Sequence, residues 1–389
     1  MKVRVGLALA LCSLLVYGCT RDRLLDKKTV AVARACQWLA SQQHPDGSIA
    51  LGGQSLNPNV WETANALIAL LHCDASTYGA VIARGFEFLD ANWIEGGGLP
   101  ESVSRRLGPF KSHCVETTGT AIRAYAAAGK RAEAERLRDF LFSVQEADGG
   151  WKIGYPEART AFPNGDVLEV FPSVTGFALA GAAAVPGDRS KAERGLAWLA
   201  SRQKPEGDWG AFPDYFWTPY YATSEIAAAF AGWGRRDDPV VERLVRFTRE
   251  HQNADGSWGD AGEPRTPSRE LWTALALLTL EAAGDKAPRD VIDRGIAYLL
   301  ERQQPDGRWV GGYFKSVVVT DPDKKEDVYA TSRAALALSL RQGEKVSALL
   351  ATAMMSSGPI SPSPREPGTA KATKIVYVPA GAAGHTKLK

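Results

Sequence analysis

The sequence predicts an all-α fold, a single (α/α)6 toroid built from six helix-pair repeats over residues 29–345. One phrase recurs along the chain: a basic residue, an aromatic residue, Gln, an acidic-Gly turn and Trp. A second helix, rich in Ala and Leu, follows each copy and carries a Thr near its start. Internal repeats of this length are typical of stacked helix pairs. No repeat has the polar outer face of a capping repeat, which favours a closed ring over an open superhelix.

The repeated phrase predicts the outer helices. One clear copy contains Arg194, Trp198, Gln203, Gly207 and Trp209. Each copy is an amphipathic helix that ends at a Gly, the residue best suited to the left-handed conformation at a helix C-terminus. The other copies begin at Arg34, Arg84, Arg138, Arg243 and Arg294, and the copy at Arg84 is degenerate.

The second helices are expected to form an inner layer. Their sequences are apolar on nearly every face, which is typical of helices that pack on all sides. The Thr that marks their common register is assigned to Thr63, Thr117, Thr175, Thr223, Thr273 and Thr331.

The N-terminus, residues 1–19, is predicted to be a lipoprotein-type export signal. Lys2 and Arg4 precede an apolar stretch that is too short for a permanent membrane span. Acylation of Cys19 would then anchor the chain to a membrane. Tyr17 departs from the bacterial lipoprotein pattern, so ordinary secretion with an incidental Cys19 is the alternative. The expected location is the cell envelope, in the periplasm or on the outer surface.

The opposite end, residues 356–389, is predicted to be a disordered tail because it is basic and rich in Pro and Ser. The formal net charge of the chain is +2; residues 1–19 carry +2 and residues 365–389 carry +4, which leaves −4 on the body. A negatively charged body argues against a groove for nucleic acid.

Three cysteines remain after the signal: Cys36, Cys73 and Cys114. Their spacing matches no metal or disulfide framework. Each lies in a helical pattern beside Ala, Leu or Val, so we expect all three to be small buried hydrophobic residues.

The repeated phrase resembles the "QW" repeat of triterpene cyclases, above all squalene–hopene cyclase. The count of six pairs resembles the toroid that these enzymes share with the β subunits of protein prenyltransferases. The resemblance covers residues 29–343 approximately and implies that Gln and Trp tie neighbouring outer helices together. It also implies a terpenoid cyclase-like isomerase or lyase if the chain is an enzyme.

The resemblance implies where the family's catalytic acid would lie in this sequence. That acid is the middle Asp of Asp-x-Asp-Asp-Thr, two residues before the Thr of an inner helix. Protonating an alkene or an epoxide requires a strong, preorganised carboxylic acid in a dry cavity. No residue two before an assigned Thr is acidic, so the standard acid is predicted to be absent. These residues are Trp61, Val115, Ser173, Tyr221, Leu271 and Tyr329.

The zinc site of the prenyltransferases is not expected either. Residues 327–331 resemble the family's Asp-x-Tyr-His-Thr segment, but Ala330 occupies the place of the His ligand. The sequence therefore predicts no metal and no cofactor.

Three residues form the candidate catalytic set: Glu62, Glu116 and His113. Each glutamate directly precedes an assigned Thr in adjacent repeats, so their carboxylates are expected to approach one another. A buried pair raises one pKa and provides a general acid. Alternatively, Glu62 belongs to a capping box with Asn59 as the N-cap. His113 and Glu116 form either an acid–base pair or a salt bridge at the helix end.

Aromatic residues near the starts of the inner helices form the candidate ligand site. Aromatic walls accept flat apolar ligands, sugars or developing cations. The alternative is that these side chains only plug the ring. The candidate ligand-binding residues are Trp61, Phe171, Trp217, Tyr220, Tyr221, Trp272 and Tyr329.

Three functions are compatible with these features. The first is an exported protein that binds a small apolar or isoprenoid ligand in an aromatic cavity, with or without catalysis. The second, inferred from architecture alone, is a carbohydrate-active (α/α)6 enzyme of the cell envelope that acts on a polysaccharide. The third is a non-catalytic envelope scaffold. The sequence gives no indication of the oligomeric state.

Overall fold

The computed structural model divides into two units, residues 1–356 and residues 357–389. It describes residues 27–50, 59–102, 113–155, 170–185, 187–210, 219–259, 268–312 and 327–340, all within the first unit. None of the helices in these ranges has the length and apolar character needed to cross a bilayer.

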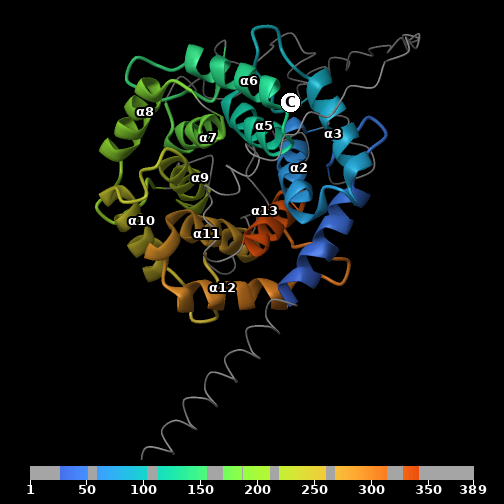
Figure 1. The fold of residues 1–389 in the computed structure, drawn as a ribbon. Helices are drawn as coiled ribbons and strands as arrows, with labels where there is room; N and C mark the ends of the chain where they lie inside the picture. The colour runs from blue at the N-terminus through green and yellow to red at the C-terminus, as the bar shows by residue number, and fades with distance from the viewer. Residues whose placement is uncertain are drawn as a thin grey trace, which may run out of the picture. The chain divides into compact units, whose positions relative to one another are not determined.

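Six helices form an inner ring (Figure 1). Each packs against the next in chain order, and the last packs back against the first, so the ring is closed. These helices bury residues on nearly all faces, which explains their Ala-rich sequences. They are α2 (Val60–Asp74), α5 (Val115–Ala127), α7 (Pro172–Ala182), α9 (Pro219–Gly232), α11 (Arg269–Ala283) and α13 (Asp327–Ser339).

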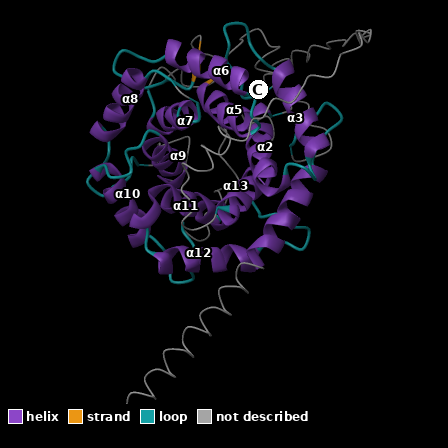
Figure 2. Ribbon diagram, in the orientation of Figure 1, coloured by secondary structure: helices purple, strands orange, loops and turns teal. Residues whose placement is uncertain are grey.

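Six amphipathic helices surround this ring (Figure 2). They are a helix over residues 27–41, α3 (Gly79–Ala91), α6 (Arg131–Ser143), α8 (Arg189–Ser201), α10 (Pro239–Glu250) and α12 (Arg289–Arg302). A short 3-10 helix, η1 (Gly284–Lys286), follows α11. Strands β1 (His113–Cys114) and β2 (Gly154–Tyr155) pair in antiparallel fashion, with His113 opposite Tyr155. The prediction of an (α/α)6 toroid is confirmed.

Among the described residues, the repeated Gln joins five of the six outer helices to the next, and the step from α3 to α6 lacks it. The side-chain amide of Gln203 donates to the carbonyl of Gly207 in its own turn (2.8 Å) and to the carbonyl of Val240 at the start of α10 (2.9 Å). Arg243 of α10 donates back to Gln203 Oε1 (2.7 Å). The same double donation recurs at Gln43, Gln145, Gln252 and Gln303. Gln therefore satisfies a helix-end carbonyl and fixes the neighbouring helix at once.

The Gly and Trp of the phrase complete the same joint. Gly207 has a φ of +110°, and a Cβ added to it would overlap the carbonyl of Arg243, so only glycine fits. The indole of Trp209 donates to the carbonyl of Leu199 near the end of α8 (2.8 Å). The expectation that Gln and Trp connect the outer helices is confirmed.

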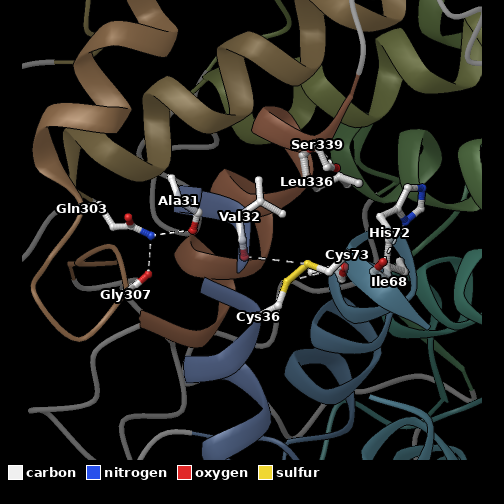
Figure 3. The surroundings of a disulfide bond; sticks show 11 residues. Ala31, Val32, Cys36, Ile68, His72, Cys73, Gln303, Gly307, Leu336 and Ser339 are labelled. Atoms are coloured by element: carbon white, nitrogen blue, oxygen red, sulfur yellow. Dashed lines mark hydrogen bonds between the residues drawn. A yellow bond between two sulfur atoms is a disulfide. The ribbon is translucent and has the colours of Figure 1, made fainter. Parts of the chain in front are cut away.

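The last repeat uses this joint to close the ring onto the first. Gln303 donates to the carbonyl of Ala31 (2.8 Å) (Figure 3). Arg34 donates to the carbonyls of Gln304 and Pro305 (3.0 and 2.7 Å). Gln303 and Ala31 are 272 positions apart in sequence, yet their hydrogen bond repeats the Gln contact made elsewhere between adjacent repeats. The seam of the toroid is built like its other joints.

A disulfide between Cys36 and Cys73 cross-links the outer helix over residues 27–41 to α2, beside this seam (Figure 3). The prediction that these two cysteines are unpaired is wrong. Their separation of 37 residues fits no short motif, and only the packing of the two helices brings the sulfurs together. Cys114 is a free, largely buried thiol, as expected, and burial raises its pKa to about 12.

Replacing Cys36 and Cys73 together with Ala is expected to lower the free energy of unfolding by about 2–4 kcal/mol, because the cross-link restricts the unfolded chain. Denaturant unfolding followed by circular dichroism, with and without reductant, measures this. Reductant should destabilise the unaltered protein and leave the double variant unchanged. A similar effect of reductant on both proteins would contradict the assignment.

Candidate functional site

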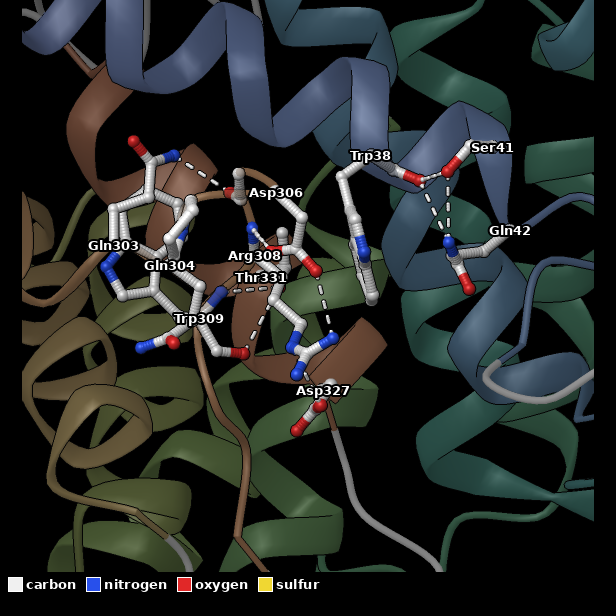
Figure 4. Close-up of polar contacts among 12 residues, drawn as sticks. Trp38, Ser41, Gln42, Gln303, Gln304, Asp306, Arg308, Trp309, Asp327 and Thr331 are labelled. Atoms are coloured by element: carbon white, nitrogen blue, oxygen red, sulfur yellow. Dashed lines mark hydrogen bonds and ion pairs between the residues drawn. The ribbon is translucent and has the colours of Figure 1, made fainter.

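The Thr hydroxyls fix the register of the inner helices. In four repeats, the hydroxyl of Thr63, Thr175, Thr273 or Thr331 accepts a hydrogen bond from the backbone N–H of the residue at the Trp position. Figure 4 shows this contact between Trp309 and Thr331 (3.0 Å). In the second repeat the acceptor is Thr118, which binds the N–H of Leu99 (3.1 Å). The assignment of Thr117 to this position is therefore wrong by one residue.

Moving the register from Thr117 to Thr118 changes which residue occupies the position of the family's acid. Two residues before Thr118 stands Glu116, not Val115. The prediction that no acidic residue occupies this position is wrong. Of the three aspartates in the Asp-x-Asp-Asp-Thr pattern, only the middle one has an acidic counterpart in this chain. Cys114 and Thr117 occupy the places of the other two.

Residues at this register meet inside the ring. The hydroxyl of Tyr221 on α9 donates to Glu116 Oε2 on α5, a distance of 3.0 Å that spans α7. The ring centroids of Trp61 on α2 and Tyr329 on α13 lie 4.3 Å apart. The ring centroid of Tyr221 lies 6.3 Å from that of Tyr329 and 6.5 Å from that of Trp61. We name Trp61, Glu116, Tyr221 and Tyr329 the upper layer.

Burial controls the protonation of Glu116. Loss of hydration raises its pKa to about 8, and the charges of Glu101 and Glu225 act in the same direction. The hydroxyls of Tyr221 and Ser173 oppose this rise by binding the carboxylate. Glu116 therefore keeps its proton at neutral pH. Burial, with the charge of Glu116, also raises the pKa of Tyr221 well above its ordinary value.

A set of three charged residues, two of them fully buried and Arg123 partly exposed, lies further along α5, α9 and α13. Glu225 on α9 forms ion pairs with Arg123 on α5 (2.8 Å) and with Arg333 on α13 (2.8 Å). The side chains of Glu225 and Arg333 are each 2% exposed. The guanidinium of Arg333 lies 5.1 Å from the ring centroid of Tyr329. We name Arg123, Glu225 and Arg333 the charged triad.

Squalene–hopene cyclases are among the proteins whose sequences resemble this chain. The family model described as "Squalene-hopene cyclase C-terminal domain" matches residues 177–320. Squalene–hopene cyclase of Alicyclobacillus acidocaldarius is 26% identical over 74% of this chain and 57% of its own length. The enzyme of the same name from Bradyrhizobium diazoefficiens is 29% identical over 48% of this chain and 31% of its own.

Solved structures show the same fold. The type II terpene cyclase MstE from Scytonema superposes with a TM-score of 0.64 at 18% identity, over 82% of this chain and 98% of that one. The chain is terpenoid cyclase-like. An α-amylase from Clostridium perfringens shares the fold more distantly, with a TM-score of 0.54 at 12% identity. This terpenoid cyclase-like chain spans about a third to just over half the length of the curated squalene–hopene cyclases it matches.

The register shift also removes the geometric reason for pairing Glu62 with Glu116. Glu62 precedes Thr63 by one residue, whereas Glu116 precedes Thr118 by two, so the two carboxylates occupy different faces of their helices. Asn59 Oδ1 accepts the N–H of Glu62 (2.9 Å), which is the N-cap of the alternative interpretation. Glu62 is fully buried at the start of α2.

His113 lies toward the outer layer. Its ring packs 4.5 Å from that of Phe140 on α6 and interacts with the backbone of Glu95 and Gly98. Burial lowers its pKa, so the imidazole is neutral at physiological pH. These contacts give His113 a structural role in packing α6 against the turn.

The candidate aromatic residues divide into two groups. Trp61, Tyr221 and Tyr329 belong to the upper layer. Tyr220 packs on Phe247 of α10 (6.2 Å), Trp272 packs on Gly259, and Phe171 is the N-cap residue of α7, so these three lie in other parts of the fold. Trp217 and Cys19 lie outside the described residues.

The candidate residues predicted from the sequence do not include Arg123, Glu225 or Arg333. A signal was present, because these are charged residues on helices that are otherwise apolar on every face. Glu225 follows Tyr221 by four residues and Arg333 follows Tyr329 by four, which places each pair on one helix face.

The stability of the protein is expected to fall as the pH rises from about 4.5 to about 8. In this window the folded state holds the proton of Glu116, with its pKa of about 8, whereas the unfolded chain releases it near 4.5. The associated loss is on the order of 4 kcal/mol. Urea unfolding at a series of pH values, compared between the unaltered protein and Glu116→Gln, measures it.

Glu116→Gln should lack this decline, because the amide does not titrate. The matched control is Glu135→Gln on the exposed face of α6, which should retain the decline. Parallel pH profiles for the unaltered protein and Glu116→Gln would show that Glu116 is not the group responsible.

Proposed function

We propose that this protein is an isoprenoid-binding, terpenoid cyclase-like enzyme of the cell envelope in which Glu116 donates the initiating proton. The observation that carries the proposal is the position of Glu116, two residues before Thr118 on an inner helix and hydrogen-bonded to Tyr221. This is the place of the acid in the family that the repeats resemble. Burial keeps the carboxyl group protonated at neutral pH, which a proton donor requires.

The aromatic members of the upper layer support an apolar polyene as the ligand class. The rings of Trp61, Tyr221 and Tyr329 lie close together near Glu116, and aromatic faces attract developing positive charge. Structures of MstE hold geranylgeranyl dihydroxybenzoate as substrate and merosterolic acid A as product. These ligands share an isoprenoid chain with squalene, the compound that appears in the names of the sequence relatives.

The chemistry follows from these groups. The carboxyl of Glu116 transfers its proton to a double bond or an epoxide oxygen, which leaves a carboxylate and a cationic substrate. A neighbouring double bond attacks the cation and closes a ring, and loss of a proton from carbon ends the reaction. The aromatic faces stabilise the intermediate cation. The net change is an isomerisation, and the proton is regained from solvent or product.

Glu116→Gln is expected to lower turnover of squalene or a geranylgeranyl-substituted aromatic acid by at least about 100-fold, because the amide cannot donate the proton. Gas chromatography–mass spectrometry of products formed in D2O measures both the rate and the incorporation of one deuterium. Thr117→Ser is the matched control, since it keeps a hydroxyl beside the acid, and should retain turnover. Full activity of Glu116→Gln with the deuterium still incorporated would exclude Glu116 as the donor.

A polysaccharide substrate is less well supported. Most glycoside hydrolases need two carboxyl groups about 5–9.5 Å apart. Among the described residues, Glu225 influences the charge of Glu116, but it is held between two arginines. The aromatic rings gathered near Glu116 favour the isoprenoid.

Export and a lipid anchor at Cys19 form part of the proposal. The Cys36–Cys73 disulfide supports an oxidising compartment, because such bonds are rare in a reducing cytosol. Cys19→Ser is expected to move the protein from the membrane fraction to the soluble fraction. Intact-mass measurement should find the acyl chains on the unaltered protein and none on the variant. Membrane association that survives Cys19→Ser, without any acyl mass, would contradict the anchor.

A further inference from the structure

Three members of the upper layer, Glu116, Tyr221 and Tyr329, share their helices with the charged triad. Glu116 and Arg123 are seven residues apart on α5, Tyr221 and Glu225 four apart on α9, and Tyr329 and Arg333 four apart on α13. These spacings place the two members of each pair on one face of a helix. The three helices alternate around the inner ring, so both layers reach across the lumen.

Helix α5 is connected to α9 twice, once in each layer. Tyr221 binds Glu116 in the upper layer, and Glu225 binds Arg123 below it. Glycines on α5 and α7 permit the close approach that these bonds need. A Cβ on Gly119 would overlap the carbonyl of Phe177, and a Cβ on Gly176 would come within 3.2 Å of the backbone nitrogen of Ile226.

The charged triad carries two positive charges and one negative charge. Removing such charges from water is costly, and a buried ion pair is weak evidence for stability compared with apolar side chains of similar volume. Apolar residues at Arg123, Glu225 and Arg333 would fill the centre of the ring without that cost. The presence of the triad under the proton donor therefore requires a reason other than packing.

We propose that Glu225, held between Arg123 and Arg333, is a positioning residue that fixes Glu116 and Tyr221 and sets the charge that Glu116 experiences. The inference rests on the proposed role of Glu116 as proton donor. The carboxylate of Glu225 favours the protonated form of Glu116, and the two arginines limit that effect. The ion pairs also hold α9 at a fixed distance from α5, so the Tyr221 hydroxyl stays on Glu116 Oε2.

The other titratable groups around Glu116 come from four elements. Glu101 precedes α5 in the turn, Cys114 lies in β1, Tyr221 and Glu225 lie on α9, and Tyr329 lies on α13. Only Glu225 among them is paired with both arginines of the triad. Its replacement changes the charge near Glu116 without substituting either partner of the Tyr221–Glu116 hydrogen bond.

Two substitutions test the inference because they are expected to act in opposite directions. Glu225→Gln removes a negative charge and should lower the titration midpoint of Glu116 by about one pH unit or more. Arg333→Gln removes a positive charge and should raise it. The midpoint is measured without ligand, from the infrared band of the protonated carboxyl that disappears in Glu116→Gln. A purely structural role would not produce shifts of opposite sign.

Arg333→Lys keeps the charge and should restore the midpoint of the unaltered protein, which also provides a test if Glu225→Gln does not fold. Shifts in the same direction for Glu225→Gln and Arg333→Gln, or no shift in either, would overturn the inference. So would an Arg333→Lys midpoint equal to that of Arg333→Gln.

The outcome is separable from that of the proposed function. Opposite shifts in a protein that turns over no isoprenoid would support the role of the triad and count against the donor role of Glu116. Proton donation by Glu116 without these shifts would support the donor role of Glu116 and count against the role of the triad.

Discussion

The side-chain amide of the repeated Gln is the contact on which the ring depends. It donates to its own turn and to the first turn of the following outer helix, and the Gly beside it leaves room for that helix to approach. Because Gln303 makes the same bonds to the first repeat, the ring closes there with the Gln joint found at four other steps. Closure in turn places the six inner helices side by side, with their starts at one end of the ring.

An inner helix that packs on all sides leaves little room for polar residues. Each polar side chain on it must be paired or lose its hydration without compensation. In the described structure, Glu116 is bound by Tyr221 and Glu225 by two arginines. The exceptions to the apolar pattern therefore mark where polar side chains of several inner helices meet in the ring, and they indicate these contacts better than proximity to the repeated Thr does.

Most of the fold could be predicted from the sequence because the repeated residues determine where each outer helix ends and how it contacts its neighbour. Gln, Gly and Trp recur at fixed spacing, and each has one physical role that the structure repeats. The candidate site was less predictable. Thr117 and Thr118 are adjacent and chemically identical, so the sequence alone did not show which of them accepts the N–H of Leu99. That single residue decided whether Val115 or Glu116 occupied the position of the acid.

The other features that the sequence did not predict are contacts between residues that are distant in sequence. The disulfide joins residues 37 positions apart on two helices, and the triad joins three helices that are not neighbours in the ring. Neither leaves a local motif. His113 shows the converse, because its closeness to Glu116 in sequence suggested an acid–base pair, whereas the strand that carries it directs its ring to Phe140.

The environment of Glu116 also constrains the kind of reaction that it supports. A carboxyl with a pKa near 8 retains its proton but gives it up less readily than an ordinary carboxylic acid. In the reaction proposed for Glu116, initiation would therefore depend on how well the cation is stabilised once formed, a role that the rings of Trp61, Tyr221 and Tyr329 would serve. The net positive charge of the triad would oppose a cation close to it, so the proposed reaction would move positive charge away from the triad as rings close.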